Sequence, residues 1–257
     1  MILVLGGTSE SRQLVTRLAG PGQPLIVCTA TPYGGDLLKE CRGNAQIITG
    51  RLNEDELAGL MVAQNITVLI DMTHPFAELA TATAQRACAR SGVLYLRFER
   101  PSLPLPDHPL VVQVNTYQAA ARRAVELASQ TVFITTGTKT LPLFAGAAHA
   151  AGLRAVARIL PDPAGLRLCL DLGIAPEDIV AMQGPFSVDM NKALLTHYKA
   201  SVLVTKESGP AGGSDTKIKA ALDLSIPVVV IKRPPAPAGA ISDLDELINQ
   251  IKITMRQ

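Results

Sequence analysis

The chain has 257 residues, 47% of them hydrophobic and 18% charged, and it carries a net charge of +2. This composition indicates a globular protein with either one large domain or two small ones. The near balance of charge and the absence of a Lys/Arg run argue against a nucleic-acid-binding protein. With no tryptophan and only 4% aromatic residues, a base-stacking surface for single strands is also disfavoured.

The four cysteines are scattered, without a C-x-x-C pair or a histidine at metal-ligand spacing, so we expect reduced thiols and no metal site. Met1 leads directly into an apolar run, which leaves no room for a signal peptide. No apolar segment approaches the roughly 18 residues that span a bilayer. The sequence therefore predicts a cytoplasmic protein that contacts no membrane.

The first twelve residues predict a buried strand, a tight turn and the start of a helix. An apolar run stops at Gly6-Gly7, and a helix-compatible segment begins at Thr8 or Ser9. Glycine allows positive φ and the close approach of a phosphate, while the amides of the first helical turn attract anions. We therefore predict a dinucleotide site at this turn. The third glycine of the G-x-G-x-x-G fingerprint is missing, and an ordinary strand-to-helix turn is the alternative.

A second buried strand, residues 25–31, ends in Thr29-Ala30-Thr31, where an NAD-preferring domain places an acid. Because no carboxylate is there to repel a 2′-phosphate, we predict NADPH as the cofactor, with NADH as the alternative. The hydroxyls of Thr29 and Thr31 are its expected partners. Three arginines are candidate cations for the phosphate or, equally, solvated surface residues: Arg12, Arg42 and Arg51.

The rest of the first half alternates in the same way, with strands expected at 45–48, 67–71 and 93–98 and helices at 53–64 and 76–91. Residues 72–77 follow the strand at 67–71. They should face the same crevice as the glycine turn, because open α/β sheets bind ligands beyond the carboxyl ends of their strands. His74 is placed there to contact substrate or nicotinamide; alternatively, it closes the turn before Pro75.

Four prolines within residues 101–109 exclude a helix or central strand and indicate a linker, so we expect two domains, 1–100 and 101–257. The second half repeats the alternation of strand and helix and ends in an amphipathic helix at 242–255. Such alternation predicts parallel strands with right-handed crossovers. We predict an α/β fold with two Rossmann-like, doubly wound parallel-sheet domains and an active site in the cleft between them.

Three expected strand ends in the second half carry small hydroxyls, backbone amides and helix starts, namely 135–139, 183–187 and 205–217. Such groups bind carboxylates or phosphates. For Lys206 and Gly212-Gly213 we favour an anion site, because two glycines between lysines suit an anion-binding nest better than a regular element. For Ser187, helix capping is an equally good explanation.

Seven short motifs run almost the whole length of the chain: LGGTSE at 5–10, DMTHPFA at 71–77, YLRFERP at 95–101, TTGTK at 135–139, ARILP at 157–161, GPFS at 184–187 and TKESG at 205–209 with Gly212-Gly213. Each is generic alone. In this order they resemble the precorrin-6A reductase family of cobalamin biosynthesis, whose anaerobic-pathway members reduce cobalt-precorrin-6A.

The resemblance implies a nicotinamide-dependent reductase that saturates one double bond of a corrin precursor. The implied substrate is a tetrapyrrole with many carboxylates, which suits a cleft with several cations, namely Arg97, Arg100, Lys139, Lys206 and Lys217. Transient contact with neighbouring pathway enzymes is compatible with such a role. The protein would hold the two reactants together and exclude water.

The site residues that we expect fall into three groups. His74 or Lys206 orients the substrate or delivers the proton, and the sequence does not decide between them. The cofactor is assigned to Gly6, Gly7, Thr8, Glu10, Arg12, Thr29, Thr31 and Thr73. The substrate is assigned to Lys139, Ser187, Ser208, Gly212, Gly213 and Lys217.

Two rival functions stay open at this point. A short-chain reductase needs a Tyr-x-x-x-Lys pair, but neither Tyr117 nor Tyr198 has a lysine four residues on, and Tyr95 is followed by Glu99. A non-catalytic NADPH sensor would keep the glycine turn, yet it would have no reason for the lysines and glycines of the second half.

Overall fold

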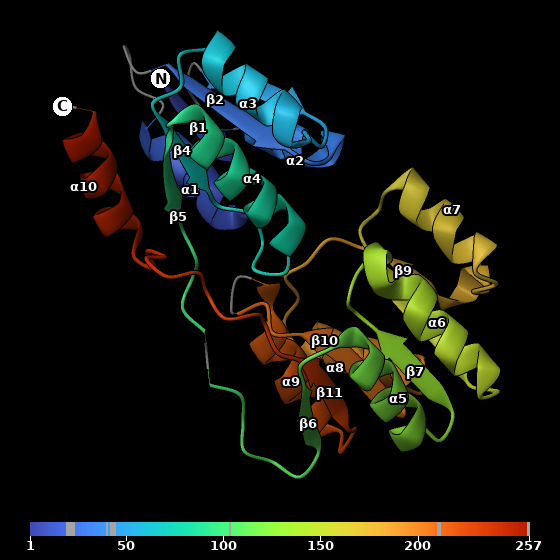
Figure 1. Ribbon diagram of the computed structural model, residues 1–257. Helices are drawn as coiled ribbons and strands as arrows, with labels where there is room; N and C mark the ends of the chain where they lie inside the picture. The colour runs from blue at the N-terminus through green and yellow to red at the C-terminus, as the bar shows by residue number, and fades with distance from the viewer. Residues whose placement is uncertain (19–23, 40, 42–44, 103, 210–211, 256–257) are drawn as a thin grey trace. The chain divides into compact units, whose positions relative to one another are not determined.

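The computed structural model describes residues 1–18, 24–39, 41, 45–102, 104–209 and 212–255. These residues divide into two compact units, Met1–Pro101 with Pro235–Gln257 and Ser102–Pro234. Figure 1 shows that each unit is a sheet with helices lying against it. No helix of the described chain is long and apolar enough to cross a membrane.

Unit 1 contains a five-stranded parallel sheet in the order β3-β2-β1-β4-β5. Its strands are β1 (Ile2–Leu5), β2 (Leu25–Thr29), β3 (Ala45–Thr49), β4 (Val68–Asp71) and β5 (Leu94–Arg97). Its helices are α1 (Ser9–Leu18), α2 (Pro32–Lys39), α3 (Glu54–Ala63), α4 (Glu78–Ser91) and α10 (Leu244–Thr254). The chain order reverses between β1 and β4, which makes their carboxyl ends the expected ligand edge.

The central strand β1 is buried on both faces, as its unbroken apolar sequence requires. Ile2 joins a core cluster with Leu14 of α1 and Leu247 of α10. Leu3, which points to the opposite face, joins a second cluster with Met61 of α3. Each large apolar side chain buried in this way contributes roughly 1.5–3 kcal/mol, so these two clusters supply most of the stability of unit 1.

The C-terminal helix differs from the sequence-based domain assignment. We expected 101–257 to form one domain, but α10 packs in unit 1, where Leu247, Ile248 and Ile251 are buried. Upstream, Ile241 forms a parallel bridge to Phe98 and donates its N–H to the Arg97 carbonyl at 2.8 Å. An amphipathic pattern shows that a helix covers a sheet but not which sheet it covers.

Helix α2 was not expected, because the adjacent Gly34 and Gly35 are poor helix formers. Its first turn is stabilised by Thr31 Oγ1, which accepts the Gly34 N–H at 3.1 Å. A Cβ at Gly35 would lie 2.5 Å from Thr49 Cγ2, so glycine lets α2 approach β3 closely. Close packing of helix and strand therefore outweighs low helix propensity in this segment.

Unit 2 contains a six-stranded parallel sheet in the order β6-β11-β10-β7-β8-β9. Its strands are β6 (Val111–Val114), β7 (Thr131–Ile134), β8 (Arg154–Ile159), β9 (Ile179–Ala181), β10 (Val202–Lys206) and β11 (Val228–Ile231). Its helices are α5 (Tyr117–Leu127), α6 (Leu141–Ala150), α7 (Pro163–Asp171), α8 (Val188–His197) and α9 (Ser214–Asp223), with short 3₁₀ turns η1 (Thr138–Thr140) and η2 (Pro176–Asp178). The predicted α/β fold with two parallel sheets is confirmed.

The chain order of this second sheet reverses between β7 and β10, which pair directly. Around them, Phe133, Val156, Leu203 and Ile218 form one apolar cluster. The rigid centre of the sheet therefore fixes the residues that follow β7 and β10, where the TTGTK and TKESG motifs lie.

Candidate active site

In unit 1, three strand ends predicted to form the nucleotide site lie together. The Gly6 N–H donates to the Cys28 carbonyl at 2.8 Å, which joins the ends of β1 and β2. Thr8 Oγ1 donates to the Met72 carbonyl at 3.1 Å, which joins the β1 turn to the end of β4. Parallel neighbours end at the same edge of a sheet, so Gly6, Gly7 and Thr8 share this edge with Thr29 and Thr73.

The turn from β1 to α1 is built around Ser11. The N–H groups of Gly7 and Thr8 both donate to Ser11 Oγ at 3.2 Å, and the Ser11 N–H donates back to Thr8 Oγ1 at 3.1 Å. Gly7 has φ +122, a conformation that L side chains rarely adopt. Within the described chain, the N–H groups of Ser9 and Glu10 have no hydrogen-bond partner.

This turn fits the phosphates of a dinucleotide. The two unbonded amides lie at the positive end of α1, and open space surrounds the Cα of Gly7. The side chain of Glu10, predicted to contact the cofactor, forms an ion pair with Arg100 at 3.0 Å. Among the predicted phosphate cations, Arg12 is half-buried and Arg51 is exposed, while Arg42 lies outside the described residues.

At the end of β2, the two threonines differ in accessibility. Thr29 is buried, and its Oγ1 donates to the Thr31 carbonyl at 3.2 Å. Thr31 is exposed and caps α2 through the Gly34 N–H. A nucleotide ribose can therefore reach Thr31 more readily than Thr29.

At the end of β4, Asp71 is fully buried and accepts five hydrogen bonds. Its Oδ1 accepts from the Thr73 N–H and hydroxyl and from Arg97 Nη1, at 3.0, 2.7 and 2.8 Å. Its Oδ2 accepts from the hydroxyls of Thr81 and Tyr95 at 2.8 and 2.9 Å. Burial, followed by the charge of Asp71, raises the pKa of Tyr95, so the phenol stays a donor.

Arg97 is committed to this network. It is 3% exposed and forms a second ion pair with Glu99 at 3.0 Å. From the sequence we expected Arg97 to meet substrate carboxylates, and in the structure it is paired with two buried carboxylates of unit 1. Thr73, predicted to contact the cofactor, likewise bonds Asp71 and also accepts from Arg97 at 3.0 Å.

His74 follows the network in a half-buried turn. Its Nδ1 accepts the Phe76 N–H at 3.3 Å, and the two rings are 5.7 Å apart. This geometry gives His74 the turn-closing role that was the alternative to substrate contact. No observation of the described residues assigns it a catalytic role.

In unit 2, a pocket of about 280 Å³ lies at the carboxyl ends of the central strands. Two basic residues line it, Arg158 at the end of β8 and Lys217 on α9. The other lining residues are neutral: Thr135, Gly137, Ile159, Leu160, Met182, Gly184, Pro185, Phe186, Asn191, Gly212 and Gly213. The described lining of this pocket, which we call the cationic pocket, contains no carboxylate.

Arg158 is fixed by neutral groups. Its Nη1 donates to Asn191 Oδ1 at 2.8 Å, and its guanidinium lies 4.7 Å from the centre of the Phe186 ring. Asn191 in turn donates to the Ser187 carbonyl at 2.9 Å. Burial lowers the pKa of Arg158 to about 10, which still keeps it charged at neutral pH. The sequence indicated Arg158 only as part of the ARILP motif and gave no reason to expect it in the site.

Lys217 is 9% exposed, and its ammonium has no hydrogen bond or ion pair with the described residues. Its pKa is lowered to about 7, mainly by burial and further by the charges of Arg158 and Lys206, whereas the charge of Asp215 raises it. Burial and Lys139 lower the pKa of Lys206 to about 8. The structure thus places the predicted residue Lys206 close enough to both Lys139 and Lys217 for their positive charges to repel.

The glycines of this pocket are required by its packing. A Cβ on Gly212 would overlap Ser208 Oγ, and Gly213 has φ +62 at the start of α9. Ser208, predicted to bind substrate, is buried against this turn. Ser187 is exposed and caps α8 by accepting the Met190 N–H at 3.2 Å, as in the alternative that the sequence left open.

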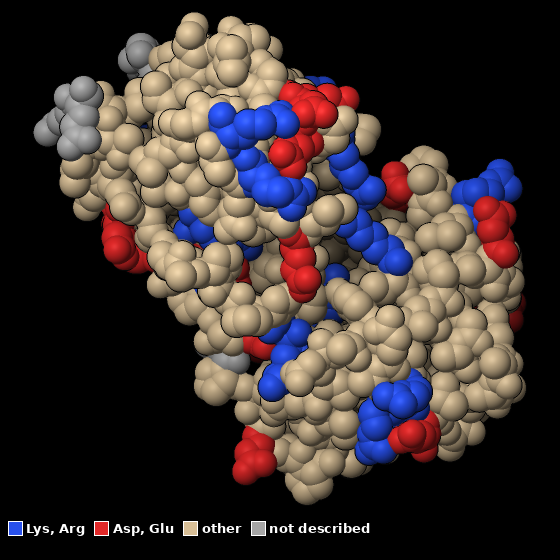
Figure 2. All heavy atoms as spheres, in the orientation of Figure 1, with Lys and Arg blue, Asp and Glu red and all other residues tan. Residues whose placement is uncertain are grey.

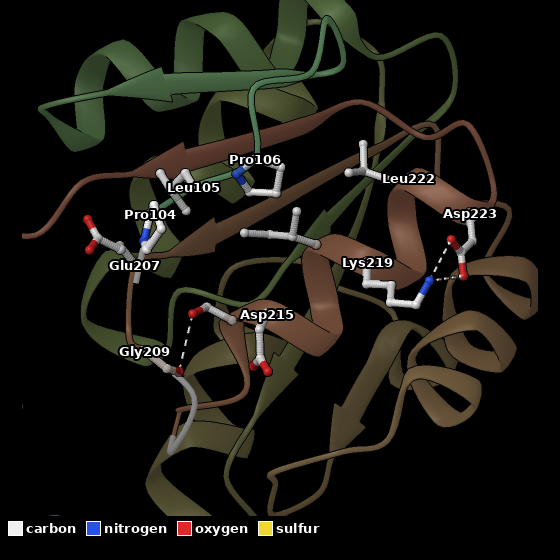
Figure 3. Close-up of a pocket in the computed structure, with 11 residues that line it drawn as sticks. Pro104, Leu105, Pro106, Glu207, Gly209, Asp215, Lys219, Leu222 and Asp223 are labelled. Atoms are coloured by element: carbon white, nitrogen blue, oxygen red, sulfur yellow. Dashed lines mark hydrogen bonds and ion pairs between the residues drawn. The ribbon is translucent and has the colours of Figure 1, made fainter. Parts of the chain in front are cut away.

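A larger cavity of about 430 Å³ lies elsewhere in unit 2 (Figure 3). Pro104, Leu105 and Pro106 face α9 across it, and its lining contains the carboxylates of Glu207, Asp215 and Asp223 beside the single lysine Lys219. Lys219 bonds Asp223 at 3.1 Å, and Glu207 pairs with Arg233 at 3.3 Å. Size alone therefore does not identify the anion site, since the smaller pocket holds the uncompensated charge.

Several surface charges of unit 1 are paired with one another. On the face in Figure 2, basic and acidic side chains gather together over α3 and α4, where Arg86 bonds Glu54 at 2.6 Å and Arg90 bonds Asp55 at 2.8 Å. Such exposed pairs contribute little to stability. Among the described residues, no group of three or more His, Cys, Asp or Glu side chains could hold a metal ion.

Comparison with known proteins gives one consistent result. The model of the family described as precorrin-6x reductase CbiJ/CobK matches residues 1–252. The chain is 38% identical to a cobalt-precorrin-6A reductase of Methanothermobacter thermautotrophicus, over 100% of this chain and 86% of that protein. It is 32% identical to a cobalt-precorrin-6A reductase of Priestia megaterium, over 98% of each chain. A solved structure, CobK precorrin-6A reductase, aligns with a TM-score of 0.79 and 27% identity over 98% of this chain and 96% of that one.

Proposed function

The chain belongs to the precorrin-6x reductase CbiJ/CobK family of cobalamin biosynthesis, and we propose that it reduces one double bond of precorrin-6A or cobalt-precorrin-6A. It is an oxidoreductase that acts on a CH–CH group and uses a reduced nicotinamide. The product would be the corresponding 6B macrocycle. This agrees with the resemblance carried by the seven sequence motifs.

One observation carries the assignment of the substrate to unit 2. The cationic pocket collects buried positive charge without a carboxylate in its described lining. Buried charge of one sign is costly unless a partner of the opposite sign arrives. A macrocycle that carries acetate and propionate groups supplies such partners. The planar guanidinium of Arg158, already oriented by Asn191, suits a two-point contact with one carboxylate.

The nucleotide is assigned to the edge formed by β1, β2 and β4 in unit 1. Support comes from the two unbonded amides of α1 and from the space beside Gly7. The bound nicotinamide supplies a hydride. The chain itself contributes orientation and exclusion of water, since the Asp71 network rigidifies the 72–77 loop beside the glycine turn.

NADPH is the cofactor that we favour over NADH. The described end of β2 offers the exposed Thr31 hydroxyl and no acid that would repel a 2′-phosphate. Arg12, a half-buried residue in the first turn of α1, is the basic residue that we assign to that phosphate. The preference is tested below by a substitution at Thr31.

Turnover by the purified full chain is the direct test. Precorrin-6A and its cobalt complex are each supplied with NADPH and with NADH, and nicotinamide absorbance, the visible spectrum and product mass are recorded. We expect nicotinamide oxidation only when macrocycle is present, with a product heavier by two hydrogen atoms. Absence of turnover in all four combinations would reject the proposed function.

A further inference from the structure

Saturation of a double bond requires a hydride and a proton, and the proposed function identifies only the source of the hydride. A proton donor must lie against the substrate and must hold a proton that it can release near neutral pH. The donor is therefore expected among the ionisable side chains of the proposed substrate site. Two lining side chains of the cationic pocket are ionisable, Arg158 and Lys217.

Arg158 is unsuited to proton transfer. Its guanidinium is held by Asn191 and stacked on Phe186, and arginine binds carboxylates as a permanently charged fork. The ammonium of Lys217 is not held in this way, because it has no hydrogen bond with a described residue. Its side chain lines the same pocket from the first turns of α9, next to the Gly212-Gly213 turn.

We infer that Lys217 is the catalytic proton donor of the reaction and that Arg158 anchors the neighbouring substrate carboxylate. The inference rests on the proposed function and adds a role that the sequence left undecided between His74 and Lys206. His74 is committed to its own turn through the Phe76 N–H. Lys206 does not belong to the described lining of the pocket, although its charge reaches Lys217.

The charges around Lys217 couple its protonation to substrate binding. Arg158 on β8 and Lys206 on β10 lower the pKa of Lys217 and so favour its neutral amine, whereas Asp215 on α9 favours the ammonium. Lys139 on η1 in turn lowers the pKa of Lys206. In the free protein, burial is the main cause of the low pKa of Lys217, and the repelling cations lower that pKa further. A carboxylate bound to Arg158 removes much of that repulsion, so substrate binding loads the proton that the reaction then uses.

The macrocycle accepts a hydride at one carbon of the double bond, and the π electron pair of that bond moves to the adjacent carbon. The adjacent carbon then takes the proton from the Lys217 ammonium. Two C–H bonds form on the macrocycle. Three bonds break: the π bond of the macrocycle, one N–H bond of the Lys217 ammonium and the C–H bond of the reduced nicotinamide that supplies the hydride, which leaves the nicotinamide oxidised. The neutral Lys217 amine regains a proton from solvent before the next turnover.

Two variants separate charge from proton delivery. Lys217→Arg keeps the positive charge but cannot release a proton readily, whereas Lys217→Met removes both. Lys219→Met is the matched control, because Lys219 lies on the same helix but is exposed and paired with Asp223. For each variant we measure macrocycle Kd, single-turnover rate with saturating NADPH, the pH profile and the urea midpoint.

We expect Lys217→Arg to bind the macrocycle as the wild type does, yet to lose about 100-fold or more in single-turnover rate. The wild-type kcat/KM should fall as pH rises through about 7, where the free enzyme loses the Lys217 proton, and this limb should be absent in Lys217→Arg. Binding of macrocycle by the wild type in weak buffer at pH 7.5 should take up protons, and Lys217→Met should take up none.

Wild-type turnover by Lys217→Arg, or an unchanged pH limb in that variant, would overturn the inference. If Lys217→Met and Arg158→Gln both leave macrocycle Kd unchanged, then the pocket is not the substrate site, and the assignment of the substrate to unit 2 fails as well. The urea midpoint of Lys217→Met shows whether a loss of turnover comes from unfolding. We expect this midpoint to equal or exceed that of the wild type, because the substitution removes a buried repelling charge.

Discussion

The strand ends of the two units carry buried arginines in opposite electrostatic settings. In unit 1, Arg97 lies between Asp71 and Glu99, at 2.8 and 3.0 Å. In unit 2, Arg158 has only an amide oxygen and an aromatic ring beside it, and Lys217 adds further positive charge. Two similar parallel sheets thus differ in how they surround a buried arginine. In unit 1 the charge is neutralised by carboxylates of the protein, whereas in unit 2 the charge has the electrostatic setting that we propose for binding an anionic ligand.

The largest effect expected from this comparison is on stability, through Arg97→Met. The substitution leaves two buried carboxylates without their shared cation, and breaking a buried ion pair costs about 3–5 kcal/mol. Urea unfolding, with hydrogen exchange to assign the loss to unit 1, measures it. Addition of Asp71→Asn and Glu99→Gln should restore most of the stability. A stable Arg97→Met protein would contradict the contrast between the units.

The next effect is on substrate affinity, through Arg158→Gln. Loss of a charge-assisted contact to one carboxylate should weaken macrocycle binding by about 1.5–3 kcal/mol, or roughly 10- to 150-fold in Kd. The unfolding free energy should change little, because Arg158 has no buried counter-ion to abandon. Arg154→Gln is a control, since Arg154 lies on the same strand but pairs with Asp178. Equal affinities of the two variants would contradict the anchoring role.

A third effect is the pH dependence of unfolding. The folded chain lowers the pKa of Lys217 from 10.5 to about 7, so between these values the unfolded chain holds a proton that the folded chain has released. The free energy of unfolding should therefore rise with pH in this window, by at most about 1.4 kcal/mol per pH unit from this lysine. Below about pH 7 the buried ammonium destabilises the fold fully.

Comparison of wild type with Lys217→Met isolates that contribution. The difference in unfolding free energy should narrow as pH rises from 7 to 10, because the wild type loses its repelling charge and the variant has none. A difference that stays constant across this range would show that Lys217 is not perturbed in the folded chain.

The smallest effect concerns the cofactor, through Thr31→Asp. A carboxylate at this exposed position should repel a 2′-phosphate and accept bonds from ribose hydroxyls, shifting the NADPH-to-NADH ratio of kcat/KM toward NADH by about 10-fold. Thr29 is less suitable, because a carboxylate there would be buried. Thr31→Asn, with the same shape and no charge, is the control. An unchanged ratio would place the ribose elsewhere.

The sequence predicted most of the fold because its signals are local. Unbroken apolar runs such as Ile2–Leu5 and Val228–Ile231 identify buried parallel strands, and Asn53, Thr116 and Ser187 all cap helices as local patterns suggest. What it missed depends on packing at a distance. Helix α2 relies on Gly35 against Thr49, and α10 covers a sheet more than 100 residues earlier in the chain, as its cluster with Ile2 and Leu14 shows.

The candidate site was predicted in part for the same reason. Glycine pairs and strand-end lysines are visible in the sequence, and Gly212, Gly213 and Lys217 do line one pocket. The sequence does not reveal which side chains lie beside a charged residue in the folded chain. Arg97 and Arg158 look alike along the chain, yet one is neutralised by Asp71 and Glu99 and the other is not. Only the spatial arrangement separates the ion-paired Arg97 from Arg158, which we propose as a substrate-binding residue.

The central claim is that the uncompensated cations of unit 2 receive the polyanionic macrocycle while the paired charges of unit 1 support the nucleotide edge. The most direct measurement is equilibrium binding of each ligand separately to wild type and to the double variant Arg158→Gln/Lys217→Met. The account predicts a large rise in macrocycle Kd with NADPH Kd unchanged. A rise in NADPH Kd with macrocycle Kd unchanged would contradict it.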